Sequence, residues 1–574
     1  MGEENTPRHV ARGARRDLLT LDNQWVRGIG RSGTLFEHVQ RHARERPGDV
    51  AVWRRLPGGG SEVTTYGELA GAARRFAQAF AERFSEARFI PLCLARSAHC
   101  LAAMLGAIGA GKAFVCLNQN LRPRQVSDIL EATGASVALV DAAGLMTLRD
   151  TWEAAPAIRR AQWWLLRGPE FGAMHERIAV RLGQAAKVDA WEDSATAPDL
   201  PEPRQQPTDP ARVGCCLFTS GSTGQPKGVL IGERDLTARA WAEARWYQLH
   251  RQDVLLNVLP FSFDVGLNQV LSAMFVGCSL VLLPSWLPAD ILDAVATRRV
   301  TGVSAVPSIW SDFLKADLPF DTRGVHASLR FVTISGGDLS REKLERLPGL
   351  LDGVAIIKTY GQTETFRSTA LPPSEFPGKR RSVGRAFADV RVYVVREDGG
   401  LAQPHEVGEI VHTGLGVMLG YLDGDDPQHK RRPNPFFGPD DEASWAVFTG
   451  DQGYLDDEGY LYLIGRHDEM LKISGNRVYP RAISEPLAAI DGVAEAEVLG
   501  VTLGDGESHL VAFIVQGSSH AWQPTLLRQQ LARQLPAFML PQHIEILPEM
   551  PRTAHGKPDR QALAARAAAL LPRT

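Results

Sequence analysis

The sequence has few cysteines, no long apolar run and no apolar signal core at its N-terminus. Six cysteines in 574 residues follow neither a disulfide framework nor paired CxxC zinc spacing, so we expect them to be buried small side chains. A membrane-spanning helix needs roughly 18 consecutive apolar residues, and no such run is present. The sequence therefore predicts a cytoplasmic protein with no membrane partner.

An excess of one charge sign is also missing. Lysine and arginine number 63 and aspartate and glutamate 66, a net charge of −3, which gives no electrostatic reason to expect a nucleic-acid partner. Residues 1–30 begin polar and basic, with no aromatic residue between Arg8 and Arg16, and we predict a flexible arm there. So long a chain exceeds one core, so several domains are expected, and the near-average composition favours an enzyme that acts on small molecules.

A polar stretch at 219–228, Thr-Ser-Gly-Ser-Thr-Gly-Gln-Pro-Lys-Gly, lies between two apolar runs that predict strands. Its glycines allow close backbone approach, its hydroxyls donate hydrogen bonds and Lys227 adds a positive charge, a combination that suits a polyphosphate. It is not a Walker A loop, because Pro226 precedes the lysine and Gly228 follows it. An ordinary solvated turn is the alternative. The candidate phosphate-binding residues are Thr219, Ser220, Gly221, Ser222, Thr223, Gly224 and Lys227.

Three further segments carry side chains that suit a binding site. Asp264 follows an aromatic run, where a carboxylate needs a partner unless it caps a helix or turn. The segments 331–338 and 356–364 each read as a strand that ends in a glycine turn. Because open α/β sheets bind ligands at the carboxyl ends of their strands, both turns are predicted to border one crevice.

These motifs, followed in order by the segments 449–451, 465–468 and 551–560, resemble the adenylate-forming superfamily of acyl-CoA synthetases, luciferases and nonribosomal peptide synthetase adenylation domains. The resemblance implies a multidomain α/β fold. A large lobe at 31–467 would combine α/β subdomains with a β-rich subdomain, and a small mobile α+β domain would follow at 468–574. It also implies that ATP and Mg²⁺ are cofactors and that a carboxylate is activated as an acyl-adenylate.

The resemblance also implies which residues hold the nucleotide. Tyr360 would pack on adenine, Thr363 would meet the α-phosphate, and Glu364 would hold Mg²⁺ through hard oxygen atoms. Asp451 would bind the ribose, because a carboxylate with two oxygens can accept hydrogen bonds from both ribose hydroxyls. The resemblance also implies that Gly336 and Arg466 bind the nucleotide.

The C-terminal segment matches the part of the superfamily that supplies a catalytic lysine. Lys557 would lie between the substrate carboxylate and the α-phosphate, and Asp468 would be the hinge between the lobes. Rotation about this hinge would withdraw the lysine and present the adenylate to a thiol. No Gly-Gly-x-Ser carrier motif follows Arg560, so we expect a separate carrier protein or CoA as the acceptor.

The pocket residues implied by the resemblance favour an amino acid. Asp264 would hold the substrate ammonium, and Arg367, buried in a pocket, would need an anion such as a second substrate carboxylate. Ser335 would hold this second carboxylate together with Arg367, and Asn268 would line the pocket wall. The pattern resembles freestanding enzymes that activate β-amino acids of the aspartate type, and an aspartate-like amino dicarboxylate is predicted. The alternative is that Arg367 turns to solvent or pairs with a neighbouring acid.

Other functions stay open at this point. Val478-Tyr-Pro480 resembles the acyl-CoA or acyl-AMP ligase branch and favours a non-amino acid, whereas Asp264 disfavours it. An amide ligase that passes the adenylate to an amine is a second alternative. A catalytically silent nucleotide-binding protein is a remote third, because Lys227, Glu364 and Lys557 are all present.

Overall fold

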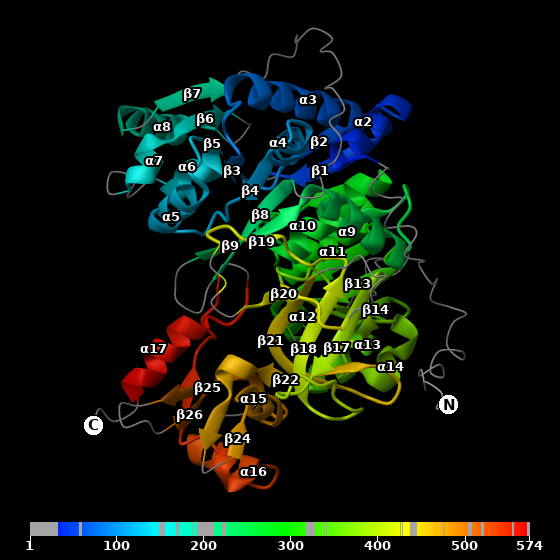
Figure 1. The fold of residues 1–574 in the computed structure, drawn as a ribbon, viewed down its shortest axis with the longest axis vertical. Coiled ribbons are helices and arrows are strands. Elements are labelled where there is room, and N and C mark those ends of the chain that lie inside the picture. The colour runs from blue at the N-terminus through cyan, green and yellow to red at the C-terminus, as the bar shows by residue number, and fades with distance from the viewer. Residues whose placement is uncertain are drawn as a thin grey trace, which may run out of the picture.

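The computed structural model describes residues 33–56, 60–148, 155–167, 171–185, 187–191, 212–220, 226–316, 328–337, 339, 341–424, 426, 429–436, 445–473, 476–502, 508–517, 522–553 and 556–570. The predicted arm at 1–30 lies outside them. Figure 1 shows an N-terminal α/β unit at the top, a second α/β unit in the middle and the C-terminal elements at the bottom.

An eight-stranded sheet forms the upper unit. Apart from the β8–β9–β19 edge, which is antiparallel, its neighbouring strands are parallel. The strands, in sheet order, are β19 (Gly420–Tyr421), β9 (Pro226–Gly232), β8 (Val213–Ser220), β4 (Ala113–Cys116), β3 (Phe89–Cys93), β5 (Val137–Val140), β6 (Gln162–Leu166) and β7 (Lys187–Trp191). Its helices are α3 (Tyr66–Arg83), α4 (Ala98–Gly109), α5 (Pro123–Thr133), α6 (Ala142–Leu148), α7 (Pro156–Arg160) and α8 (Ala173–Ala185).

A nine-stranded sheet forms the middle unit, and its six strands from β14 to β1 run parallel. Parallel strands buried on both faces are nearly continuous in apolar residues, and β13 (Phe331–Ile334) is buried along its whole length. The other strands, in sheet order around β13, are β16 (Arg385–Ala386), β15 (Thr369–Leu371), β14 (Ala355–Tyr360), then β12 (Gly302–Ala305), β10 (Val254–Asn257), β11 (Ser279–Leu282), β1 (Val50–Arg55) and β2 (Ser61–Thr65). The helices are α2 (Leu35–Glu45), α9 (Glu233–Trp246), α10 (Asp264–Val276), α11 (Pro288–Arg298), α12 (Pro307–Ala316), α13 (Arg341–Leu350) and α14 (Phe376–Lys379).

Two smaller units follow in the chain. An antiparallel sheet adjoins the middle unit and contains β17 (Val390–Val395), β18 (Gly408–Gly414), β20 (Arg431–Pro433), β21 (Trp445–Leu455) and β22 (Leu461–Arg466). The C-terminal α+β unit contains β23 (Leu471–Ile473), β24 (Asn476–Val478), β25 (Val493–Thr502), β26 (Ser508–Gln516), β27 (His543–Leu547), α15 (Arg481–Ala488), α16 (Pro524–Ala532) and α17 (Arg560–Leu570). The predicted α/β fold, with a β-rich part and a small α+β unit, is confirmed.

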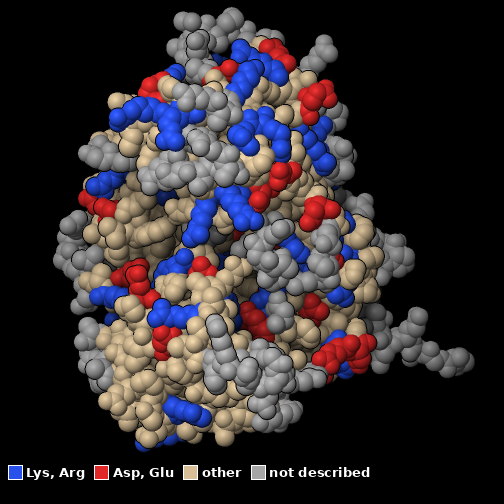
Figure 2. All heavy atoms as spheres, turned by 90° about the vertical axis from the view of Figure 1, so that its left-hand side faces the viewer, with Lys and Arg blue, Asp and Glu red and all other residues tan. Residues whose placement is uncertain are grey.

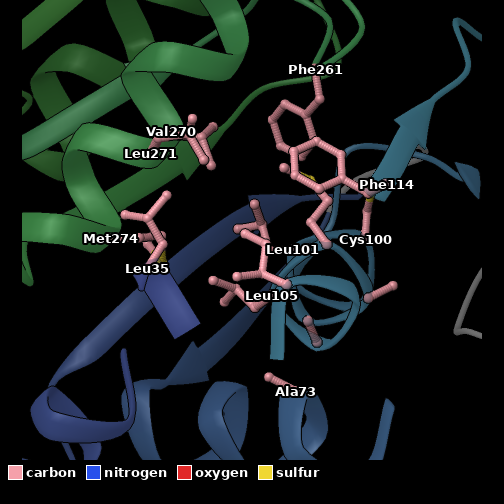
Figure 3. Close-up of a cluster of buried hydrophobic side chains, with 14 of the residues drawn as sticks. Leu35, Ala73, Cys100, Leu101, Leu105, Phe114, Phe261, Val270, Leu271 and Met274 are labelled. Atoms are coloured by element: carbon pink, nitrogen blue, oxygen red, sulfur yellow. The ribbon is translucent and has the colours of Figure 1, made fainter. Parts of the chain in front are cut away.

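Helix α10 joins the two large sheets through a shared core. Figure 3 shows Val270, Leu271 and Met274 of α10 facing side chains that come from α2 and α4, including Leu35 and Leu101. This packing fixes the axis of α10, and therefore also the position of its first residue.

The cysteines lie in the interior of the protein, and charges of both signs are mixed on its surface. All six cysteines are buried and free, and burial raises the pKa of the Cys215 thiol to about 12. On the face in Figure 2, lysine and arginine gather in the upper half with acids among them, and the lower part carries fewer charges. Among the described residues, no helix is both long and apolar enough to cross a membrane.

Asp253, immediately before β10, ties together the starts of three neighbouring strands. Its side chain is fully buried and accepts hydrogen bonds from Thr301 Oγ1 at 2.7 Å, Arg330 Nη2 at 2.8 Å and the His250 backbone N–H at 2.8 Å. Thr301 precedes β12 and Arg330 precedes β13. One carboxylate therefore helps to set the register of the strands whose opposite ends carry the site described below.

We predict that Asp253→Ala lowers the free energy of unfolding by about 2–3 kcal/mol, because it leaves several buried donors unpaired while Arg330 stays partly in water. Denaturant unfolding followed by tryptophan fluorescence measures this. The control is Asp290→Ala, which breaks a half-exposed pair with Arg55 and should cost less than about 1 kcal/mol. Equal losses in the two variants would contradict the role given to Asp253.

Candidate active site

The carboxyl ends of β12, β13 and β14 lie side by side, as predicted from the two glycine turns. Ser304 pairs with Thr333, and Thr333 pairs with Ile357 in parallel register. Just beyond these pairs the Ser335 and Thr359 hydroxyls are 2.7 Å apart and fully shielded from solvent. The sheet thus presents a row of hydroxyl groups toward the segment that follows β14.

Arg367 lies over this row and is already paired with an acid. Its Nη1 donates to Thr359 Oγ1 at 2.9 Å and to Ser335 Oγ at 3.4 Å, and its Nη2 donates to Glu243 Oε1 at 3.3 Å. Arg367 and Glu243 are 3% and 2% exposed, so this ion pair is buried. Pairing with a neighbouring acid is the alternative that the sequence left open, and it removes the electrostatic need for a second substrate carboxylate.

Glu243 belongs to a buried polar stripe on α9 that the sequence analysis missed. Asp235, Arg239, Glu243 and Tyr247 follow one another at intervals of four, so they share one helix face. Arg239 pairs with Asp235 and donates to the Gly416 carbonyl at 2.8 Å. The sequence carries no local signal for this stripe, because opposite charges four residues apart are also common on helix faces that contact solvent.

Asp264 occupies the first position of α10 and has no direct side-chain partner among the described residues. Burial raises the pKa of its carboxyl, and the positive charges of Lys557 and Arg367 oppose that rise. The helix N-terminus also favours the charged form. Asn268, one turn later, is buried, and its carbonyl accepts a hydrogen bond from Ser272 at 2.8 Å.

Lys557 reaches this site from the C-terminal unit. Its Nζ lies 5.3 Å from the centre of the Phe263 ring, next to Asp264 in sequence. The glycine at 336 has φ +78°, and a Cβ added there would lie 3.0 Å from the Phe263 ring and 3.5 Å from Lys557 Cε. A 2.7 Å hydrogen bond from the Thr553 N–H to the Lys557 carbonyl fixes the backbone of the lysine.

The residues expected to bind the nucleoside also come together. Asp451 Oδ2 accepts from the Tyr360 hydroxyl at 2.6 Å and from Gln362 Nε2 at 2.7 Å, and Arg466 Nη1 lies 3.4 Å from Oδ1. Burial and the neighbouring Asp451 charge raise the pKa of Tyr360, so the phenol stays protonated and donates. Gln362 therefore helps to hold Asp451 in place.

Glu364 lies at the phosphate end of the same segment. Its Oε1 accepts from the Tyr421 hydroxyl at 2.8 Å and from Lys430 Nζ at 2.9 Å. Burial alone would raise the pKa of Glu364, but Lys430 and these hydrogen bonds outweigh it and keep the pKa below its usual value. Thr363, one residue earlier, is half-buried.

The predicted phosphate loop connects two antiparallel strands. Thr219 pairs with Lys227 across β8 and β9, and its hydroxyl lies 3.5 Å from the Lys227 carbonyl. Lys227 Nζ lies 5.5 Å from the centre of the Tyr421 ring, which places it beside the Glu364 cluster. Of the other predicted loop residues, Gly221, Ser222, Thr223 and Gly224 lie outside the described residues, as does the side chain of Ser220.

The predicted hinge falls in a short 3-10 turn, His467–Glu469, between β22 and β23, and the Asp468 side chain lies outside the described residues. Polar contacts from α12 and α13 attach the C-terminal unit to the large lobe at the start of β25. Lys343 Nζ donates to the Ala494 carbonyl at 2.7 Å, and Lys315 pairs with Glu495 at 3.0 Å. Polar contacts of this kind are typical of parts that move relative to one another.

Family models match most of this architecture. The model of AMP-binding enzymes matches residues 39–422, and that of the AMP-binding enzyme C-terminal domain matches residues 483–557. The chain belongs to the family of AMP-binding enzymes. The resemblance stated from the motifs is thereby confirmed.

Curated relatives of this AMP-binding enzyme have different overall lengths. Isonitrile lipopeptide synthase from Streptomyces coeruleorubidus is 31% identical over 556 residues, which cover 92% of this chain and 33% of the synthase. Tyrocidine synthase 3 from Brevibacillus parabrevis is 29% identical over 87% of this chain and 7% of its own length. 2-Succinylbenzoate–CoA ligase from Enterococcus faecalis is 29% identical over 62% of this chain and 69% of the ligase. The chain thus spans a third or less of the two synthases.

Solved structures share the fold of this AMP-binding enzyme over nearly its full length. The amide bond synthetase McbA from Marinactinospora thermotolerans has a TM-score of 0.76 at 22% identity, covering 93% of this chain and 99% of its own. The o-succinylbenzoate CoA synthetase from Bacillus subtilis, solved with an acyl-adenylate, has a TM-score of 0.71 at 23% identity, covering 92% and 97%. At these identities the likeness shows the fold.

A buried histidine supports the segment that carries Glu364 and Arg367. His412 Nδ1 lies 3.0 Å from Ser368 Oγ, and Nε2 lies 2.9 Å from the Leu415 carbonyl. Burial lowers the pKa of His412 from 6.5 to about 4. The folded enzyme therefore keeps this ring neutral at pH values where the unfolded chain protonates it.

We predict that His412 lowers the free energy of unfolding by up to about 3 kcal/mol as the pH drops from 6.5 to about 4. In this range the imidazole is protonated in the unfolded chain but stays neutral in the folded enzyme. Denaturant unfolding of the wild type and His412→Gln across this range measures it. The variant should show a shallower pH dependence, and exposed His467→Gln should follow the wild type. An unchanged slope in His412→Gln would contradict the assignment.

Proposed function

We propose that this AMP-binding enzyme activates the carboxylate of an amino acid by adenylation with ATP and passes the acyl group to a thiol. One observation carries the proposal: the buried carboxylate of Asp264 has no side-chain partner among the described residues, and it directly follows Phe263, whose ring centre lies 5.3 Å from the Lys557 ammonium. Asp264 would hold the substrate ammonium while Lys557 holds its carboxylate. An α- or β-amino acid matches this pair of opposite charges.

The proposed chemistry leaves little covalent work to the protein. A carboxylate oxygen of the substrate attacks the α-phosphorus of ATP, the bond to the bridging oxygen of the β-phosphate breaks, and pyrophosphate leaves. Lys557 would neutralise the oxygens that approach one another, and Thr363 would contact the α-phosphate. Tyr360 would pack on adenine, while Asp451 and Arg466 would bind the ribose.

The carboxylate of Glu364 at the phosphate end fits a magnesium ion that is shared with ATP. Among the described residues no three His, Cys, Asp or Glu side chains form a metal cluster, and Glu364 offers one carboxylate. Mg²⁺ commonly takes one or two carboxylates and completes its shell with phosphates and water. Bound at Glu364, it would add positive charge to the phosphates. The hydroxyls and N–H groups of the 219–228 loop, with Lys227, would bind the same phosphates.

The charge balance of the pocket favours an amino acid with an uncharged side chain. Glu243 and Arg367 neutralise each other, as do Asp235 and Arg239, so Asp264 leaves one net negative charge. Lys557 brings one positive charge, and a zwitterionic amino acid adds none. A second substrate carboxylate would instead leave a buried anion unpaired. The proposed substrate differs from the amino dicarboxylate expected from the sequence. That expectation took the anion beside Arg367 to be a substrate carboxylate, whereas Glu243 of the protein pairs with it.

The acceptor is proposed from the relatives and from the C-terminal unit. The name of one synthase specifies a lipopeptide, whereas those of other relatives and neighbours specify CoA ligases and an amide bond synthetase. We favour the phosphopantetheine thiol of a separate carrier protein, with CoA as the alternative. Rotation about Asp468 would withdraw Lys557 and admit this thiol, and the polar contacts between the lobes support such a movement.

We predict that Lys557→Ala lowers amino-acid-dependent pyrophosphate exchange at least about a hundredfold, because one charge that stabilises the transition state is lost. ATP affinity and the melting temperature should stay near those of the wild type, since an exposed turn carries the lysine. Arg566→Ala, an exposed cation on α17, is the matched control. Exchange at the wild-type rate in Lys557→Ala would refute its assigned role.

We predict that the wild type prefers uncharged amino acids over aspartate-like ones in pyrophosphate exchange. Glu243→Gln should shift this preference toward aspartate-like acids by about tenfold or more, because it leaves the Arg367 guanidinium without its anion. The double variant Glu243→Gln/Arg367→Leu should return it toward uncharged substrates. A wild type that prefers aspartate-like acids, or one that accepts only non-amino acids, would overturn the proposed charge balance.

A further inference from the structure

Lys430 forms an ion pair with Glu364, the carboxylate that is expected to lie close to the phosphates of ATP. The Lys430 and Glu364 side chains are 10% and 9% exposed, and their 2.9 Å contact is shared with the Tyr421 hydroxyl on one oxygen, Oε1. The Phe448 backbone N–H donates to the Lys430 carbonyl at 2.7 Å, and β20 begins at the next residue. The lysine is thus held in place by strand pairing.

The same cluster adjoins the exit of the phosphate loop. Tyr421 pairs with Val229 across β19 and β9, and the Leu422 N–H donates to the Gly228 carbonyl at 2.8 Å. Lys227 approaches the Tyr421 ring from the loop itself. Two ammonium groups, from segments about two hundred residues apart in sequence, therefore flank one tyrosine and one carboxylate.

We propose that Lys430 is a phosphate-binding residue that performs part of the electrostatic work of a divalent cation at this end of the site. The inference rests on the proposed function, since it requires ATP in the crevice. An ammonium sheltered from water, on the same carboxylate oxygen as the Tyr421 hydroxyl whose ring Lys227 approaches, would attract the β- and γ-phosphates by charge-assisted hydrogen bonds. Because it also neutralises Oε1 of Glu364, it weakens the attraction of that carboxylate for Mg²⁺. ATP without Mg²⁺ would consequently bind more tightly than it would if Lys430 did not neutralise Glu364.

A structural role for Lys430 alone makes a different prediction. If the lysine served only to neutralise buried Glu364, its removal would lower stability, and it would leave ATP affinity unchanged in a protein that already carries Glu364→Gln. A phosphate contact affects ATP and leaves AMP unchanged, since AMP lacks the β- and γ-phosphates. The effect should also be largest without divalent cations, because added Mg²⁺ supplies the missing charge.

The test is calorimetric titration of the full-length protein with ATP and with AMP, in EDTA and in saturating Mg²⁺. For Lys430→Met we expect ATP affinity in EDTA to fall about tenfold or more, a smaller fall in Mg²⁺ and unchanged AMP affinity. Lys430→Arg should retain most of the metal-free affinity. Arg432→Met is the control, because this neighbouring cation contacts the His429 carbonyl and the Phe448 ring.

Each other outcome has a defined meaning. Unchanged ATP affinity of Lys430→Met in EDTA, or an equal loss for AMP, overturns the inference while the proposed function stands. A wild type that binds no ATP under either condition overturns the proposed function and the inference together. Should Lys430→Met fail to fold, Glu364→Gln/Lys430→Met removes both charges and is compared with Glu364→Gln alone, with the same loss of metal-free ATP affinity expected.

Discussion

The burial of charge in one crevice constrains the rest of this structure. An unpaired ionised group inside a protein costs several kcal/mol, so each buried ion needs a counter-ion or must remain neutral. Arg367 meets this requirement through Glu243, and Glu364 meets it through Lys430. Among the described residues, the Asp264 carboxylate has no counter-ion in direct contact. Of these three buried ions, the one left without a partner is therefore the acid that is proposed to hold the substrate ammonium.

The scaffold fixes each of these charges on a different element. Helix α9 supplies Glu243 from within its body, and α10 supplies Asp264 from its first residue. Between Glu364 and Arg367 the chain turns sharply at Phe366, a fully buried residue with φ +64°. A large side chain in this left-handed region is strained, and such strain is maintained where the surrounding structure requires it. The turn lets two residues three positions apart serve the phosphate end and the substrate end.

Much of the site could be predicted from the sequence because local motifs carry it. The glycine turns after β13 and β14, the aspartate at the start of α10 and the glycine beside Lys557 each have a local signature. The counter-ions do not. Glu243 and Lys430 reach the site through tertiary packing, and on their own segments they resemble ordinary helix and loop charges. A buried arginine predicts that an anion is near, but sequence spacing does not show whether protein or substrate supplies it.

Lys557 connects the charge of the pocket to the arrangement of the two lobes. The negative charge of Asp264 attracts the positive charge of Lys557, and this attraction favours the lobe arrangement seen here. A bound amino acid would give each of them its own partner, an ammonium for the aspartate and a carboxylate for the lysine. Once the carboxylate has become part of the mixed anhydride, it has lost its own negative charge and only the α-phosphate charge still faces Lys557, while Asp264 would keep the ammonium. This fall in the negative charge that faces Lys557 would be a physical reason for the proposed rotation of the C-terminal unit to follow adenylation.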